Sequence, residues 1–173
     1  MILEIRLLGD PILRSRTKPV DRFDDELASL ARDMIETMYD ADGVGLAAPQ
    51  VGDGRRLTVV DVGDPRDGSE VLALVNPRVV RREGTVPSEE GCLSIPGIVE
   101  TIERAEEVEV EYQDLTGATR RVAGRELLSR VLQHEIDHLD GILFIDHLGA
   151  MKRRIVVREW QKKMKAAREE PVH

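Results

Sequence analysis

The stretch RELLSRVLQHEIDHL, residues 125–139, decides the fold because it combines helical periodicity with the pattern H-E-x-x-H. Residues four apart on a helix lie one above the other, so the imidazoles of His134 and His138 can reach a single metal ion. Gly141 follows the last apolar residue and predicts the end of the helix. We therefore expect a helix over 125–139 that presents two metal ligands.

The apolar residues of this helix indicate which side faces the protein core. At about 100° per residue, four residues share one narrow stripe: Leu127, Val131, His134 and His138. Four more widen it into an apolar arc: Leu128, Leu132, Ile136 and Leu139. Glu135 falls inside this arc, whereas the opposite face is expected to carry Glu126, Arg130, Gln133 and Asp137. A glutamate directed into the core beside two histidines indicates a chemical role.

The histidine pair has two interpretations. One makes His134 and His138 core residues whose nitrogens are satisfied by the backbone, which is the commoner role of a single buried histidine. The other makes them metal ligands. An unpaired buried carboxylate is costly, and a nearby dication or a proton received from water removes much of that cost. Two histidines in register beside an inward Glu135 therefore favour the metal site.

A metal site on this helix needs a third protein ligand. One class of zinc peptidase carries a histidine where this chain has Phe144, and His147 comes three residues too late. A second class uses a downstream glutamate, for which Glu159 is available, although its Lys/Arg-rich surroundings favour a solvated charge. Cys92 lies upstream in EEGCLSIPG, residues 89–97, a turn-like segment between β-rich runs. A lone cysteine is usually a small buried hydrophobe, but with two histidines it forms a Cys-His-His set with an open fourth position.

The rest of the chain predicts an α+β protein. Residues 25–39 have the spacing of an amphipathic helix, capped by Asp24 or Asp25. Four β-rich runs lie between residues 56 and 122: LTVVDV, VLALV, VEVEYQ and TRRVA. We expect mostly antiparallel sheets packed around the central buried H-E-x-x-H helix, with a C-terminal helix over 152–168. That last helix is expected to pack Ile155, Val156, Trp160 and Met164 on the body.

Length, composition and charge limit the possible classes. A chain of 173 residues, 41% hydrophobic and 34% charged, fits a single domain over 1–173, with residues 150–173 as C-terminal helix and tail. No apolar stretch approaches the roughly 20 residues of a membrane span. The net charge of −8 argues against DNA binding, and Cys92, the only cysteine, excludes an internal disulfide. We therefore expect a cytoplasmic protein without a membrane or DNA partner.

The segment GVGLAAPQ, residues 43–50, formally matches the dinucleotide fingerprint G-x-G-x-x-A. That fingerprint requires a preceding strand and a following helix, whereas here a predicted helix precedes and the run LTVVDV follows. The small side chains leave the backbone bare, so that a peptide substrate could lie against it. A tight loop packed on its neighbours is the alternative interpretation.

Three segments together resemble the peptide deformylases, whose pattern is G-φ-G-φ-A-A-x-Q, then E-G-C-φ-S, then Q-H-E-φ-D-H. Here they stand as Gly43–Gln50, Glu90–Ser94 and Gln133–His138, and the similarity extends to about Gly149. The resemblance implies a metal-dependent enzyme that hydrolyses the formyl group from the N-terminal formyl-methionine of nascent polypeptides and releases formate.

The resemblance also implies a role for particular residues. It makes Cys92, His134 and His138 the metal ligands and Glu135 the general acid/base for an attacking water. The expected native metal is Fe²⁺, one per chain, with Zn²⁺, Ni²⁺ or Co²⁺ as substitutes. By the same resemblance, the oxyanion of the intermediate is held by the metal and by two groups of the chain, the side-chain amide of Gln50 and the backbone N–H of Leu93.

Substrate binding and support of the site are assigned in the same way. The substrate backbone is expected to pair near Val44 and Gly45. Val44, Leu127 and Val131 would form the pocket for the methionine side chain. Glu90 and Arg104 resemble a pair that braces the cysteine segment.

The chain is locally basic from residue 151 onward. One interpretation is a solvated terminal helix. The sharper one is contact with ribosomal RNA near the peptide exit, through Lys152, Arg153, Arg154, Lys162, Lys163 and Lys165.

Overall fold

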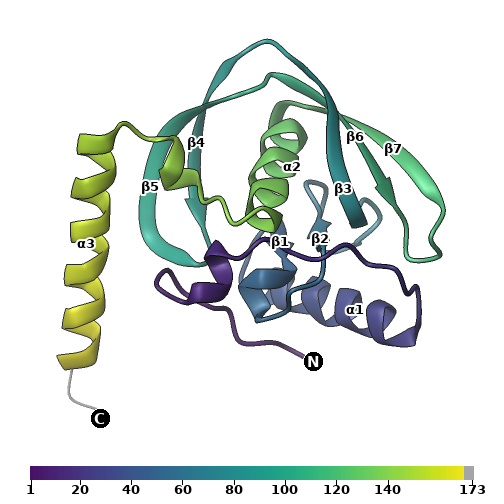
Figure 1. Cartoon of the computed structure of the whole chain (residues 1–173), viewed down its shortest axis with the longest axis horizontal. Coiled ribbons are helices and arrows are strands. Elements are labelled where there is room, and N and C mark those ends of the chain that lie inside the picture. Colours follow the sequence, from purple (N-terminus) through teal and green to yellow (C-terminus); the bar gives the residue numbers. More distant parts are fainter. Residues whose placement is uncertain (170–173) are drawn as a thin grey trace.

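The computed structural model describes residues 1–169, and its helices and strands are arranged around one central helix (Figure 1). The α-helices are α1 (Asp25–Asp40), α2 (Glu126–Leu139) and α3 (Ala150–Glu169). The strands are β1 (Gly45–Ala47), β2 (Leu57–Val60), β3 (Leu72–Glu83), β4 (Val86–Cys92), β5 (Ile95–Arg104), β6 (Glu107–Gln113) and β7 (Thr119–Arg125). Short 3-10 turns are η1 (Pro11–Arg14), η2 (Ala48–Val51) and η3 (Phe144–His147).

The strands form two antiparallel sheets, one on each side of α2. The larger has five strands in the order β1-β2-β3-β6-β7, and the smaller consists of β4 and β5 alone. In Figure 1, α2 lies between these sheets, α1 lies beneath the larger sheet, and α3 stands beside β5. The predicted α+β class, with a buried helix among antiparallel strands and a C-terminal helix, is confirmed.

Apolar side chains fix α2 in this position. Leu132 and Ile136 are buried in a cluster with Val60, Leu74 and Val110 of the larger sheet. Burial of such a side chain contributes roughly 1.5–3 kcal/mol, so the helix is held mainly by this face. The helix begins directly after β7, where Glu126 makes the turn with a φ of 52°.

The two flanking helices follow their sequence signals closely. Asp24 caps α1 by accepting a hydrogen bond from the backbone N–H of Leu27 at 3.0 Å, and Met34 and Met38 are fully buried. Helix α3 packs through Val156 and Trp160. The expectation that Ile155 also packs is wrong, because it is 59% exposed and lies about 100° round the helix from Val156.

Two further expectations about the site region need correction. The segment 89–97 is turn-like only at Leu93 and Ser94, because its other residues belong to β4 and β5, which form a hairpin in which Cys92 pairs with Ile95. Gln133 and Asp137 do not lie on a solvent face. Gln133 is 6% exposed, and its amide bonds the backbone N–H and C=O of Ala105. Asp137 contacts a buried arginine. A helical wheel assigns polar residues to solvent and cannot foresee such partners.

A further expectation concerns membrane-spanning segments, of which the sequence predicts none. Within residues 1–169, no helix combines the length and the apolar character needed to span a bilayer.

Gly141 ends α2 and sets the direction of the next segment. Its φ is 75°, and its N–H donates to the carbonyl of His138 at 3.1 Å. A Cβ at this position would lie 2.6 Å from the backbone oxygen of Arg14. The position therefore favours glycine both by conformation and by space.

Replacing Gly141 by alanine should lower the free energy of unfolding by about 1–3 kcal/mol, because a left-handed conformation and a backbone clash are imposed together. Urea denaturation followed by circular dichroism measures this. Gly54→Ala is the control, since an added Cβ there has nothing within 4 Å. Equal stability of the two variants would contradict this account.

Candidate metal centre

Three side chains from two elements meet at the end of the β4–β5 hairpin. Cys92 comes from β4, and His134 and His138 come from successive turns of α2. One donor atom from each lies within 4.8 Å of the others. Nε2 of His138 is 3.3 Å from the sulfur of Cys92 and 3.1 Å from Nε2 of His134. The structure thus brings together the three residues that the sequence predicts as ligands.

The spacing of these atoms is suited to a shared metal ion. Donors about 2.0–2.3 Å from one tetrahedral ion lie roughly 3.3–3.6 Å apart, close to the separations seen here. The set of one thiolate and two imidazoles suits zinc, iron, nickel or cobalt. A carboxylate oxygen of Glu135, Oε2, is buried beside the cluster without a hydrogen-bond partner in residues 1–169. These residues therefore fit a dication.

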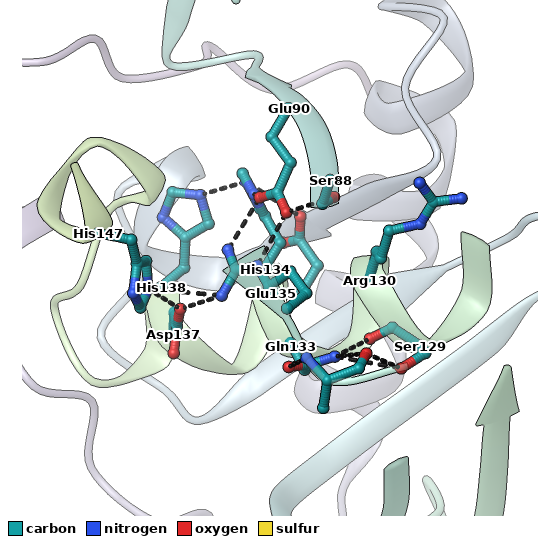
Figure 2. A network of polar contacts seen from close by, with 12 residues as sticks. Ser88, Glu90, Ser129, Arg130, Gln133, His134, Glu135, Asp137, His138 and His147 are labelled. Carbon is teal, nitrogen blue, oxygen red and sulfur yellow. Dashed lines mark hydrogen bonds and ion pairs between the residues drawn. The ribbon is translucent and has the colours of Figure 1, made fainter. Parts of the chain in front are cut away.

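A network of charged side chains contacts His134 on the side away from Cys92 and His138 (Figure 2). Oε1 of Glu90 lies 2.8 Å from Nδ1 of His134, which leaves Nε2 free to face the cluster. Arg104 donates from Nε and Nη2 to both oxygens of Glu90, at 2.8 Å each. Its third contact, from Nη1, is to Asp137 at 2.7 Å. Ser88 also donates to Glu90 at 2.8 Å. The orientation of His134 is therefore fixed by carboxylate and guanidinium together.

The protonation of the site reflects this concentration of charge. Burial raises the pKa of Glu90, but hydrogen bonds from Arg104 and His134 outweigh burial and lower that pKa to about 2. Burial lowers the pKa of His134, yet its interactions with Cys92 and Glu90 raise the pKa to about 10. His134 thus attracts a proton, whereas burial and the charge of His134 lower the pKa of His138. A bound dication would take the place of that proton, since only a neutral imidazole coordinates.

Glu135 lies on the inward side of α2, as the wheel predicts. It is 4% exposed, and its Oε1 is 3.9 Å from Nε2 of His134. Burial raises the pKa of its carboxyl to about 7, against the opposing charge of His134. Gly45 adjoins it so closely that an added Cβ would lie 2.8 Å from Cγ of Glu135. The bare backbone at this position therefore accommodates Glu135 itself.

Phe144 occupies the place in sequence where another class has a third histidine. It is buried, and its ring stacks on His134 with centroids 6.0 Å apart and planes 24° apart. It therefore packs against a ligand candidate and offers no donor atom. Glu159 lies on the exposed surface of α3 and pairs with Lys163 at 3.8 Å.

Gln50 is buried next to the cysteine. Its Oε1 accepts from the backbone N–H of Ala47 at 2.9 Å, so its NH₂ group points the other way. That nitrogen is 3.6 Å from the sulfur of Cys92 and 3.1 Å from Oγ of Ser94. Leu93, half-buried, follows Cys92 in the turn of the hairpin. Both predicted oxyanion donors therefore adjoin the cluster.

A cavity of about 350 Å³ opens beside the cluster. Its walls include the apolar residues expected to bind methionine: Val44, Leu127 and Val131. Val44 and Leu127 are 41% and 44% exposed, which is high for such side chains, whereas Val131 is buried. Arg130 also lines the cavity. The structure therefore places all twelve predicted site residues in or around one cavity and its supporting network.

Sequence reasoning missed three members of that network: Ser88, Asp137 and His147. Asp137 is 2.9 Å from Nε2 of His147. Ser88 carries no signal in the sequence, because it lies two residues before its partner Glu90 and outside the motif that begins there. For Asp137 the one available signal was its place in the motif Q-H-E-φ-D-H, directly before His138.

An antiparallel α+β fold with a helix-borne H-E-x-x-H, a cysteine as third ligand candidate and an adjoining cavity defines a metal-dependent hydrolase. The sequence profile of the family described as polypeptide deformylase matches residues 2–154. The chain belongs to this family. Its members are metal-dependent and remove the N-formyl group from nascent polypeptides, so the chain is a hydrolase acting on N-formyl-methionyl peptides.

Similar proteins agree with this membership. A peptide deformylase of Acidobacterium capsulatum is 48% identical over 166 residues, which cover 96% of this chain and 98% of the relative. The crystal structure of a peptide deformylase from Legionella pneumophila has a TM-score of 0.91 at 44% identity, covering 99% and 100% of the two chains. That of a Synechococcus elongatus deformylase with actinonin has a TM-score of 0.86 at 44% identity, covering 94% and 88%.

Replacing Glu90 by glutamine should lower zinc affinity by about 10- to 100-fold, the usual effect of losing a partner of a histidine ligand. The amide keeps the size of the side chain but loses the charge that holds Arg104 and His134. Competition with a chromophoric chelator measures the dissociation constant. Glu103→Gln, on the exposed face of β5 beside Arg104, is the control and should leave affinity unchanged. An unaltered affinity in the Glu90 variant would refute the bracing role.

Proposed function

We propose that residues 1–173 form one peptide deformylase catalytic domain that works in the cytoplasm on new polypeptides, with residues 170–173 outside the part that the structure describes. The observation that carries this is the convergence of Cys92 with both histidines of the helix motif. A peptidase of the H-E-x-x-H type would draw its third ligand from downstream, where Phe144 and Glu159 supply none.

Cys92, His134 and His138 would hold the metal. When bound, it supplies Lewis-acid polarisation of the formyl carbonyl and lowers the pKa of a water molecule. Ferrous iron is the proposed native ion on the basis of the family resemblance. Zinc, nickel or cobalt would substitute, because the same donors suit each of them.

Glu135 is the proposed general acid/base. Its carboxyl takes a proton from the attacking water and then delivers one to the amine that leaves as the C–N bond breaks. A pKa of about 7 suits both steps, since the group can hold or release a proton near neutrality. Glu135 beside a dication held by the three ligands would favour its ionised form, which is the form needed first.

Gln50 and Leu93 are the proposed donors to the oxyanion. The NH₂ group of Gln50 is oriented by the bond between its Oε1 and Ala47. Donation to the oxyanion would use the hydrogen that faces Cys92, while the other hydrogen stays on Ser94. The backbone N–H of Leu93 comes from the hairpin turn next to Cys92. Two donors fixed by separate elements would stabilise the negative charge that develops on the formyl oxygen as the formyl carbon becomes tetrahedral.

The substrate backbone is proposed to pair with the segment around Val44 and Gly45. Strand β1 is an edge strand of the five-stranded sheet, and both residues line the cavity. An extended peptide can therefore add to it. The methionine side chain would occupy the apolar wall formed by Val44, Leu127 and Val131. Burial of this side chain contributes about 1.5–3 kcal/mol to recognition.

Glu135→Gln should lower formate release from formyl-Met-Ala-Ser by about 10²- to 10⁴-fold, because proton transfer is lost while the shape beside Gly45 is kept. Apoprotein is loaded with ferrous iron without oxygen, and metal content is measured for each variant. Glu126→Gln, exposed at the start of α2, is the control. Cleavage of unblocked peptides without formate release from metal-loaded wild type would instead support an endopeptidase.

A ribosome partner is also proposed, through the basic residues of α3. Two of the six named cations contact the body: Lys152 pairs with Glu100 at 3.0 Å, and Lys163 donates to the carbonyl of Gly97 at 2.9 Å. The remaining four are Arg153, Arg154, Lys162 and Lys165. These four are exposed and could meet phosphates locally despite the acidic net charge.

Replacing those four cations by glutamine should weaken co-sedimentation with ribosomes and flatten its dependence on salt, since fewer counterions are released. Turnover of a free formyl-peptide should stay unchanged. The control replaces four exposed arginines of the larger sheet: Arg81, Arg82, Arg120 and Arg121. Equal weakening by both sets would indicate non-specific charge, and no weakening would exclude α3 as the contact.

A further inference from the structure

A path of polar contacts runs from the metal centre to the protein surface and ends at His147 (Figure 2). It leads from His134 to Glu90 at 2.8 Å, from Glu90 to Arg104 at 2.8 Å, and from Arg104 to Asp137 at 2.7 Å. Asp137 then contacts Nε2 of His147 at 2.9 Å. The side chain of His147 is 37% exposed, whereas that of Arg104 is 4% exposed.

We propose that His147 is a positioning residue for the metal centre. Its Nε2–H donates to Asp137 and thereby leaves Arg104 to hold Glu90, which orients His134. The role concerns retention of the metal and rests on the proposed function of Cys92, His134 and His138 as ligands.

The charges around Arg104 are unequal in number. One buried guanidinium serves two carboxylates, with Nε and Nη2 on Glu90 and Nη1 on Asp137. The carboxylates therefore compete for a single cation. A second donor to Asp137 relieves that competition. Oδ2 of Asp137 accepts from both Nη1 of Arg104 and Nε2 of His147.

The direction of the His147 contact follows from its chemistry. An ionised carboxylate only accepts, so Nε2 must carry the hydrogen. Nη1 of Arg104 is also a donor, and its 3.4 Å separation from Nε2 is a contact between two donors that both face Asp137. His147 can therefore support Arg104 only through Asp137.

The position of His147 is fixed by the turn that carries it. It ends η3, where Asp146 accepts from the backbone N–H of Leu143 at 2.9 Å and from Arg14 at 2.6 Å. Phe144, at the start of the same turn, stacks on His134. One short element thus contacts the ligand His134 directly by a ring and indirectly by a hydrogen bond. A freely solvated surface histidine would lack such anchoring.

The test compares His147→Phe, which keeps a ring but removes the donor, with His147→Gln, whose amide nitrogen can replace Nε2. Zinc affinity is measured by chelator competition, and the cobalt-loaded protein is examined by visible absorption. We expect the Phe variant to bind zinc about 3- to 10-fold more weakly and to show an altered cobalt spectrum. The expected loss is smaller than the roughly 10- to 100-fold loss of metal affinity that follows removal of a partner in direct contact with a ligand, because His147 acts through Asp137. The Gln variant should lie within about twofold of wild type.

Thermal unfolding of the apoproteins separates a loss of folding from a loss of metal. The effect of His147→Phe should also disappear in an Asp137→Asn background, because the path is already interrupted there. The proposal would be overturned if the Phe variant bound zinc as tightly as wild type. It would also be overturned if His147→Phe lowered zinc affinity equally with and without Asp137→Asn. Zinc binding by the wild-type protein would leave the proposed function intact in both cases. Wild-type protein that binds no metal would overturn both.

Discussion

The buried guanidinium of Arg104 is the interaction on which the arrangement of the site depends. It ends β5, binds both oxygens of Glu90 on β4 and reaches Asp137 on α2. A buried charge without partners is strongly unfavourable, so these three elements can pack only when all the contacts form together. The same contacts bring the hairpin that carries Cys92 against the turns of α2 that carry the histidines. Electrostatic satisfaction and assembly of the donor set are thus one event.

Much of the fold could be predicted from the sequence because local signals agree with the global arrangement. The predicted helix over 125–139 differs by one residue from α2, since apolar periodicity and Gly141 mark its limits. Cys92 could be grouped with the two histidines by donor chemistry and family pattern. The turn at Leu93 and Ser94 agrees with Gly and Pro in EEGCLSIPG, but these residues do not indicate that β4 and β5 continue into the segment on both sides of the turn. Gln133 and Asp137 were misplaced because their partners, Ala105 and Arg104, are distant in sequence.

The glycine-rich segment shows how a formal motif acquires a different physical meaning in its fold. At Gly45 the absent side chain makes room for Glu135, which approaches from α2. Gly45 also pairs with Val60 across the sheet and lines the cavity. One residue therefore joins the sheet, the proposed substrate strand and the proposed acid/base. None of these requirements involves a nucleotide, which agrees with the order of helix, segment and strand.

The two-stranded sheet has a mechanical consequence. An isolated pair of strands is marginally stable in water. Here β4 and β5 depend on η3 and α3 for packing and on side-chain contacts of Glu90 and Arg104 with α2. Helix α2 instead lies in the apolar cluster of the larger sheet. Ile95, Ile98 and Ile102 of β5 are buried in a different cluster with Phe144 and Trp160, and Cys92 packs against it. The thiolate and the imidazoles are thus anchored in two separate apolar clusters, so the donor set is complete only while both clusters are packed.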